Sequence, residues 1–140
     1  SGLVNLLKHA ARGFVFSAAI PPAQAAAAKA AFEVIIDEPD RIEKVQRNAR
    51  IFIDGLQEIG FDTMSSETAI VPVLCGTDEK AYELVRLCQN QDIFVLPVVS
   101  PAVPEGLSRL RATVTAGHSK TQIEHALSVL EIAGKQAGLI

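Results

Sequence analysis

The sequence predicts an α+β protein, a two-layer sandwich in which helices cover one face of a small, mainly antiparallel sheet. Three observations lead to this class. Apolar residues recur at helical spacing in several segments and alternate strictly in another. From residue 39 the expected elements follow in the order helix, strand, helix, strand, strand, helix. The segment before residue 39 is apolar and Ala-rich throughout, which indicates a separate arm over residues 1–38 and a small domain over residues 39–140.

The arm is predicted to contain two helices joined by an extended segment. The first helix is expected to end near Gly13, a typical helix-ending residue, and residues 14–16 to be extended. The proline pair at 21–22 begins a second helix that runs to residue 36. This helix is apolar almost all round, a pattern that indicates burial on several sides. We therefore expect another domain, another subunit, or both to cover the arm.

The first half of the small domain is predicted to form a helix, a strand and a helix. Apolar residues at helical spacing over 39–59 predict a helix that Gly60 ends. Residues 68–76 form the first predicted strand, where Pro72 favours either an edge position or a gap in the hydrogen-bond ladder. Thr77 is the expected N-cap of the next helix, which is predicted over residues 80–87. The residues of that helix expected to face inward are Ala81, Leu84, Val85 and Cys88.

The second half is predicted to add two strands and a helix. Residues 92–100 form a strand, and a Pro-rich loop over 101–106 leads into the next strand. Ser119 is expected to cap the last helix, with Gln122 completing a capping box.

The stretch GLSRLRATVTAGHS, residues 106–119, alternates between apolar and polar side chains. Successive side chains of a strand point to opposite faces, so one face takes Leu110, Ala112 and Val114 and is expected to be the core. The other face takes Arg109, Arg111, Thr113 and Thr115. An arginine there either lies on a solvated sheet face or recognises a carboxylate or phosphate through its planar guanidinium. The pattern alone leaves both interpretations open.

Composition excludes several classes of function. The chain has 140 residues, a net charge of −3 and dispersed basic residues, which argues against a nucleic-acid partner. No apolar run approaches the ~20 residues of a transmembrane helix. The three histidines lie at no metal-ligand spacing. The two cysteines and the absence of a signal-peptide pattern predict reduced thiols in a cytoplasmic protein.

Two further residues are candidate catalytic groups. His118 could be a catalytic histidine, but its place just before a capped helix favours a structural role in the loop. Cys75 could be a nucleophile, although the sequence places no basic partner for it. No nucleophile elbow, phosphate-binding glycine loop, HExxH or CxxC motif occurs in the sequence.

Three stretches together resemble the C-terminal third of the α-oxoamine synthases: FVFSAAIPPA at 14–23, TAIVPVLCG at 68–76 and IFVLPVVSPAVPEGLSRLRATVTAGHS at 93–119. These enzymes use pyridoxal 5'-phosphate and have the aspartate-aminotransferase-like fold. The resemblance implies the C-terminal domain of that fold. It also implies an acyltransferase activity that condenses an amino acid with an acyl-CoA, releasing CoA and CO2, to give an aminoketone in a biosynthetic pathway. A homodimer is implied as well.

The resemblance assigns roles to individual residues. Arg111 matches the position that binds the α-carboxylate of the amino-acid substrate, which leaves Arg109 as support or as part of a surface ion pair. Ser17 matches the hydroxyl residue that reaches the cofactor phosphate of the neighbouring subunit. Ala18 departs from the Thr or Asn found there in some synthases. The arm over 1–38 would bridge to a large cofactor-binding domain and to the dimer partner.

The family's lysine that carries the cofactor has no match in the chain, so we expect a fragment that is inactive alone and contains no catalytic residue. Which amino acid and which acyl-CoA the intact enzyme uses is left open. Two alternatives also remain open, the small domain of a related aminotransferase and a non-catalytic ligand-binding or dimerisation module. None of the six lysines lies in the family's lysine motif: Lys8, Lys29, Lys44, Lys80, Lys120 and Lys135.

Overall fold

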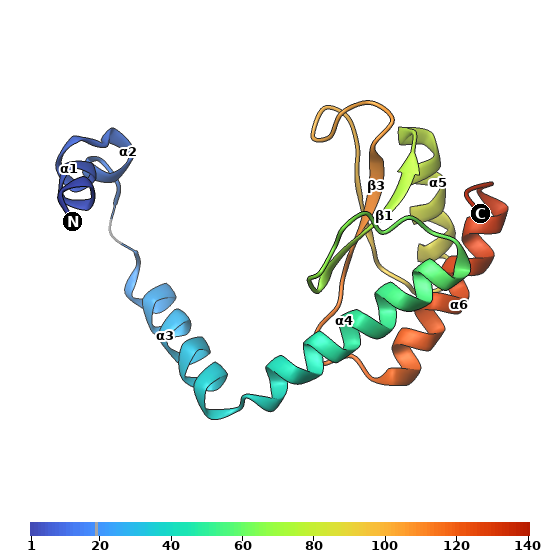
Figure 1. Ribbon diagram of the computed structural model, residues 1–140, viewed down its shortest axis with the longest axis horizontal. Coiled ribbons are helices and arrows are strands. Elements are labelled where there is room, and N and C mark those ends of the chain that lie inside the picture. Colours follow the sequence, from blue (N-terminus) through green and yellow to red (C-terminus); the bar gives the residue numbers. More distant parts are fainter. Residues whose placement is uncertain (19) are drawn as a thin grey trace. The chain divides into compact units, whose positions relative to one another are not determined.

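The computed structural model describes residues 1–18 and 20–140, which divide into two compact units, Ser1–Glu38 and Pro39–Ile140. The first unit contains three helices (Figure 1), α1 (Gly2–Ala10), α2 (Arg12–Val15) and α3 (Pro22–Asp37). Pro21 is the N-cap of α3 and Pro22 its first residue, which confirms the predicted start of this helix. None of these helices buries a side chain within the described part of the unit.

Two predictions for the first unit are wrong. Residues 14–16 are not extended, because α2 runs to Val15. Gly13 lies inside α2, whereas α1 ends three residues earlier, before the extended backbone of Ala11. The carbonyl of Ala11 accepts hydrogen bonds from the backbone N–H groups of Phe14 and Val15, both at 2.9 Å. These local bonds satisfy the backbone groups that a strand would have to pair with a neighbour, so the β-preference of Phe and Val does not decide the conformation.

The second unit is built on a three-stranded antiparallel sheet of β1 (Ile70–Gly76), β2 (Leu96–Val98) and β3 (Ser108–Thr113). The strand order is β1-β3-β2, so β3 is central and pairs with both neighbours. This arrangement confirms the predicted α+β class with a small antiparallel sheet. Pro72 lies in β1, an edge strand as predicted. The first two strands are shorter than predicted, and β2 keeps only the three residues that pair with β3.

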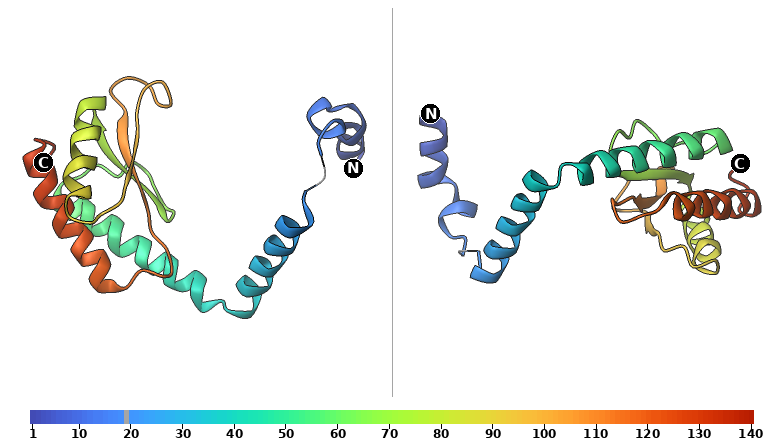
Figure 2. Two further views of the ribbon diagram at one scale, coloured as in Figure 1. Left: turned by 180° about the vertical axis from the view of Figure 1, so that it is seen from behind. Right: turned by 90° about the horizontal axis from the view of Figure 1, so that it is seen from below.

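Three helices complete the second unit: α4 (Asp40–Ile59), α5 (Asp78–Gln89) and α6 (Lys120–Gln136). Figures 1 and 2 show α5 and α6 next to each other against the sheet, where they contact one another. The predicted caps of the helices are confirmed, although α5 is longer at both ends than the predicted residues 80–87. Gly60 ends α4 in the left-handed region at a φ of 112°, and the Thr77 side chain accepts from Lys80 N. Ser119 and Gln122 form the expected capping box.

The core lies between the helices and one face of the sheet, as the alternation in β3 predicted. Leu110 is completely buried, Ala112 is 5% exposed and Val114, just after the strand, is also buried. From the helices, Leu56, Leu84 and Leu130 are each completely buried against this face. The opposite face of β3 carries Arg109 and Arg111, and the helical layer leaves it open.

We expect Leu110→Ala to lower the free energy of unfolding by about 2–5 kcal/mol, because it removes buried methyl groups and leaves a cavity. Leu96→Ala is the matched control, since Leu96 is 50% exposed on the neighbouring strand. Urea unfolding followed by circular dichroism measures both variants. Equal losses for the two would contradict the assignment of Leu110 to the centre of the core.

Candidate functional site

The candidate site lies on the open face of the sheet, where β3 presents its two arginines. Arg111 lies opposite Pro72 of β1 and Leu96 of β2, and Arg109 lies opposite Leu74 and Val98. Because β3 is the central strand, both arginines are in the middle of the sheet and not at its edge. Arg111 is exposed and Arg109 half-buried.

Neither arginine is neutralised by a carboxylate of the residues that the structure describes. In residues 1–18 and 20–140, no carboxylate oxygen lies within 4.0 Å of either guanidinium. The same part of the chain pairs other cations with acids one turn away on their own helices, among them Lys29, Arg86, Lys120 and Lys135. The open sheet face therefore carries two positive charges that an anion can approach.

Arg109 is held by a residue just before its own strand and by a loop. Its Nε donates to the carbonyl of Leu107 at 2.9 Å, and its Nη1 lies 3.1 Å from the sulfur of Met64. Met64 has a positive φ of 55°, and the Asp62 carboxylate accepts from its backbone N–H at 2.7 Å. Of the two roles expected for Arg109, these contacts correspond to support and not to an ion pair. The sequence did not predict the contact between Met64 and Arg109, because no motif near Met64 indicates that its loop lies beside β3.

A depression of about 390 Å³ joins these groups on the open face. Its wall combines the two guanidinium groups of β3, two serines of one loop and apolar side chains of the two edge strands. A guanidinium matches the two oxygens of a carboxylate, so the depression can hold an organic anion. Its lining residues are Met64, Ser65, Ser66, Ile70, Pro72, Val98, Arg109, Leu110 and Arg111.

Asn48 fixes the loop between β3 and α6. This asparagine is 5% exposed, and its Nδ2 donates to the carbonyls of Thr115 at 3.1 Å and His118 at 3.0 Å. The Nδ1 of His118 accepts from the backbone N–H of Thr115 at 3.2 Å. These bonds correspond to the structural role favoured for His118. Asn48 itself escaped the sequence reasoning, although a polar residue among the apolar positions of a helix is a usable signal.

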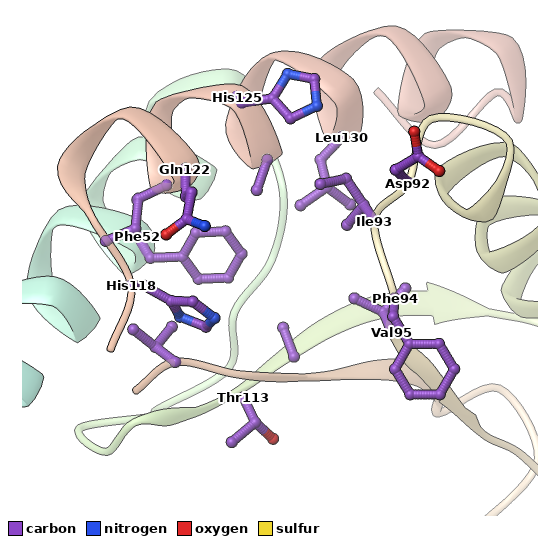
Figure 3. Close-up of a pocket in the computed structure, with 14 residues that line it drawn as sticks. Phe52, Asp92, Ile93, Phe94, Val95, Thr113, His118, Gln122, His125 and Leu130 are labelled. Atoms are coloured by element: carbon purple, nitrogen blue, oxygen red, sulfur yellow. The ribbon is translucent and has the colours of Figure 1, made fainter. Parts of the chain in front are cut away.

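A second cavity of about 390 Å³ lies on the helix-covered side of the second unit. Figure 3 shows the rings of Phe52 and His118 directed into it, with Gln122 and His125 above them on α6. Its floor is made of core side chains, and neither arginine of β3 lines it. No group of three or more His, Cys, Asp or Glu residues that could hold a metal occurs in the described chain.

Both cysteines are buried free thiols. Burial raises the pKa of Cys75 and of Cys88 from 9.0 to about 11. A thiol with a raised pKa stays protonated at neutral pH and is a poor nucleophile, so the geometry gives Cys75 no catalytic character.

Ser17 lies in the first unit, just after α2. Its exposed hydroxyl donates to the carbonyl of Phe14 at 2.7 Å, and its backbone N–H reaches the same carbonyl at 3.2 Å. The hydroxyl can bind a phosphate as a donor once it releases Phe14, so the residue fits the role implied by the resemblance. Ser17 and Arg111 belong to different units.

No helix in the described residues is long and apolar enough to span a membrane.

Comparison with known proteins identifies the class. The family model "Aminotransferase class I and II" matches residues 1–130. The chain therefore belongs to the aminotransferase class I and II family. It is 41% identical over 138 residues to an 8-amino-7-oxononanoate synthase of Symbiobacterium thermophilum, a match covering 99% of the chain. An 8-amino-7-oxononanoate synthase/2-amino-3-ketobutyrate coenzyme A ligase of Thermus thermophilus is 41% identical over the same length and coverage.

Solved structures give the same assignment. A serine palmitoyltransferase of Sphingomonas wittichii has a TM-score of 0.83 at 28% identity and covers 98% of the chain. A serine palmitoyltransferase solved with pyridoxal phosphate has a TM-score of 0.86 at 28% identity, again over 98% of the chain. These relatives confirm the resemblance to the α-oxoamine synthases. The chain spans about a third, 35%, of the length of each of these four proteins.

We expect Asn48→Ala to lower the free energy of unfolding by about 1–3 kcal/mol, because the carbonyls of Thr115 and His118 lose their buried hydrogen-bond donor. The backbone amides of residues 115–118 should also exchange with deuterium faster than those of β1. Asn90→Ala is the matched control, since Asn90 is an exposed residue that follows α5. Unchanged exchange in the 115–118 loop would show that Asn48 does not fix it.

The thiols predict a stability loss at high pH. Their pKa is 9.0 in the unfolded chain and about 11 in the fold. Below pH 9 the thiols are protonated in both states, so their ionisation does not change the free energy of unfolding there. As the pH rises from 9 toward 11, unfolded thiols ionise while folded ones do not, and stability falls. The stability advantage of wild type over the Cys75→Ala/Cys88→Ala double variant should therefore shrink across this window in urea titrations. A constant difference would contradict the raised pKa.

Proposed function

We propose that this chain is the C-terminal part of a pyridoxal-phosphate-dependent α-oxoamine synthase. The intact enzyme would condense an amino acid with an acyl-CoA, releasing CoA and CO2, to give an aminoketone. The family match and the 8-amino-7-oxononanoate synthase relatives support this proposal. The observation that carries it is Arg111, an exposed arginine in the middle of the open sheet face that has no counter-ion among the described residues. Under the resemblance to the α-oxoamine synthases, it matches the position that binds the substrate carboxylate.

Arg111 would hold and orient the amino acid. Its guanidinium can form two parallel hydrogen bonds to the α-carboxylate, which fixes the rotation of the substrate about that group. The cofactor, when bound, supplies the electron sink for a carbanion at the amino acid's α-carbon. Holding the carboxylate keeps the α-carbon in one place, the kind of positioning that contributes to rate.

The first unit would complete the enzyme across a dimer. Ser17 would donate its hydroxyl to the cofactor phosphate of the neighbouring subunit. The helices of this unit expose large apolar side chains that a large domain and a second subunit would cover. These exposed residues include Leu3, Leu6, Phe14, Phe16, Ile20, Phe32 and Ile36.

The relatives' names describe two kinds of acyl group. The compound 8-amino-7-oxononanoate has nine carbons, with a ketone at carbon 7, an amine at carbon 8 and a carboxylate at its far end. If a three-carbon amino acid loses CO2 and keeps two carbons, the acyl group contributes the other seven and carries the distal carboxylate. A palmitoyl group, named in the structural neighbours, ends in an uncharged methyl instead.

An aminotransferase is the second candidate, because the matching family model carries that description and an arginine can bind the carboxylate in either reaction. The intact protein separates the two. Release of CoA from an acyl-CoA in the presence of glycine, alanine, serine or threonine supports the synthase. Transfer of the amino group to a 2-oxo acid without CoA release supports the aminotransferase and overturns the synthase.

In the intact protein, we expect Arg111→Ala to raise the KM for the amino acid about ten- to a hundredfold, the loss of one charged hydrogen-bonded contact. The KM for the acyl-CoA should change far less. Arg86→Ala is the matched control, because this exposed arginine of α5 pairs with Glu83 on its own helix. Equal effects on both substrates, or none, would remove Arg111 from the carboxylate site.

A further inference from the structure

We propose that the cavity on the helix-covered side of the second unit binds a small, uncharged aromatic molecule that carries a carbonyl group, such as an aromatic amide or ketone. Ala112 and Val114, on the buried face of β3, line this cavity, whereas neither arginine of the open face does. The site is therefore separate from the candidate carboxylate site. The inference does not depend on the proposed function.

The cavity lies where the chain leaves the sheet. The pairing of β2 with β3 ends at Leu96 and Arg111, and residues 92–95, which come before β2, line the cavity together with the end of β3. The turn that leads into these residues is fixed, since the backbone N–H of Ile93 donates to the carbonyl of Cys88 at 3.0 Å. A ligand thus meets a wall that is already formed, which reduces the ordering cost of binding.

The walls suit a flat apolar body. Phe52 of α4 is 5% exposed, and Figure 3 shows its ring directed into the cavity. Val95, just before β2, and Leu130 of α6 are also buried and line the same space. Aromatic rings gain from offset or edge-to-face contact with one another beyond the burial of apolar area. The volume of about 390 Å³ lies in the range of small-molecule sites, so a ring with a substituent fits.

Two side chains that line the cavity present hydrogen-bond donors, because their acceptor atoms are already occupied. Nδ1 of His118 accepts from the N–H of Thr115 at 3.2 Å, so the proton of the neutral ring lies on Nε2. Oε1 of Gln122 accepts from the N–H of Ser119 at 2.9 Å, which leaves the amide NH₂ as a donor. Within the described chain neither Nε2 atom has a hydrogen-bond partner. A carbonyl oxygen has two lone pairs and matches this pair of donors.

The charges around the cavity favour a neutral ligand over a carboxylate. Among the described residues that line it there is no lysine or arginine. Asp92 lines it as well, and its exposed carboxylate would repel an anion. A charge placed among apolar walls without a counter-ion is costly. The open sheet face with its two arginines is the opposite case, so the two sites select ligands of different charge.

The experiment titrates the intact protein with four probes at about pH 8, where histidine is neutral, and follows its methyl NMR signals. Benzamide has the ring and the neutral carbonyl. Toluene lacks the carbonyl, benzoate adds a charge, and cyclohexanecarboxamide lacks the aromatic ring. We expect benzamide to bind most tightly, with a Kd on the order of 1 mM for so small a molecule. It should shift the methyl signals of Val95, Val114 and Leu130, and not those of Val98 beside the arginines.

A variant of Gln122 tests the donor without disturbing the helix. Gln122→Glu removes the amide NH₂ and keeps an acceptor for the N–H of Ser119, because glutamate at this position also completes a capping box. It should weaken the binding of benzamide about two- to tenfold, the loss of one neutral hydrogen bond. Gln136→Glu is the matched control, since it makes the same change at the other end of α6, outside the cavity.

Four results would overturn the inference. Benzamide does not bind, or another of the four probes binds as tightly. Its methyl shifts are confined to Val98, which would place it in the depression beside the arginines. The Gln122→Glu variant binds benzamide as tightly as wild type does. Tightest binding of benzamide at the cavity methyl groups, weakened by Gln122→Glu and unchanged by Gln136→Glu, supports the site.

Discussion

The burial of one face of β3 is the constraint on which the rest of the structure depends. Leu110 and Ala112 are covered by helices, and the pleat then forces Arg109 and Arg111 onto the opposite face. A shift of the register by one residue would bury both cations, which is prohibitive without partners. The hydrophobic core thus fixes the position of the two charges. Stability and candidate function share a single strand.

The second unit contributes rigidity around that strand. β1 and β2 pair with β3 from both sides, Asn48 holds the loop that follows it, and the capping box then starts α6. Each of these interactions fixes the backbone of β3 or of the segment that follows it, and none of them engages an arginine side chain. A binding face benefits from this division, because the side chains remain available to an anion while their attachment points are fixed.

The first unit differs in kind. Its helices form from local hydrogen bonds alone and bury none of their described side chains. The large apolar residues that it exposes are typical of a surface made to be covered. Under the proposed function, both the cofactor phosphate contact of Ser17 and the cover for these residues come from outside the chain. The residue that would contact the substrate carboxylate, Arg111, belongs to the second unit of this chain.

The sequence by itself determined the elements with local causes. Alternation placed the core face of β3, glycine and threonine set the helix ends at Gly60 and Thr77, and the capping box set the start of α6. It failed at residues 14–16, where β-preference had no neighbouring strand to act on. Only the tertiary structure decided that β3 is central, that Met64 contacts Arg109 from 45 residues away, and that Asn48 secures a loop 67 residues away. Those contacts join residues distant in the chain, and the spacing of side chains along one segment carries no information about them.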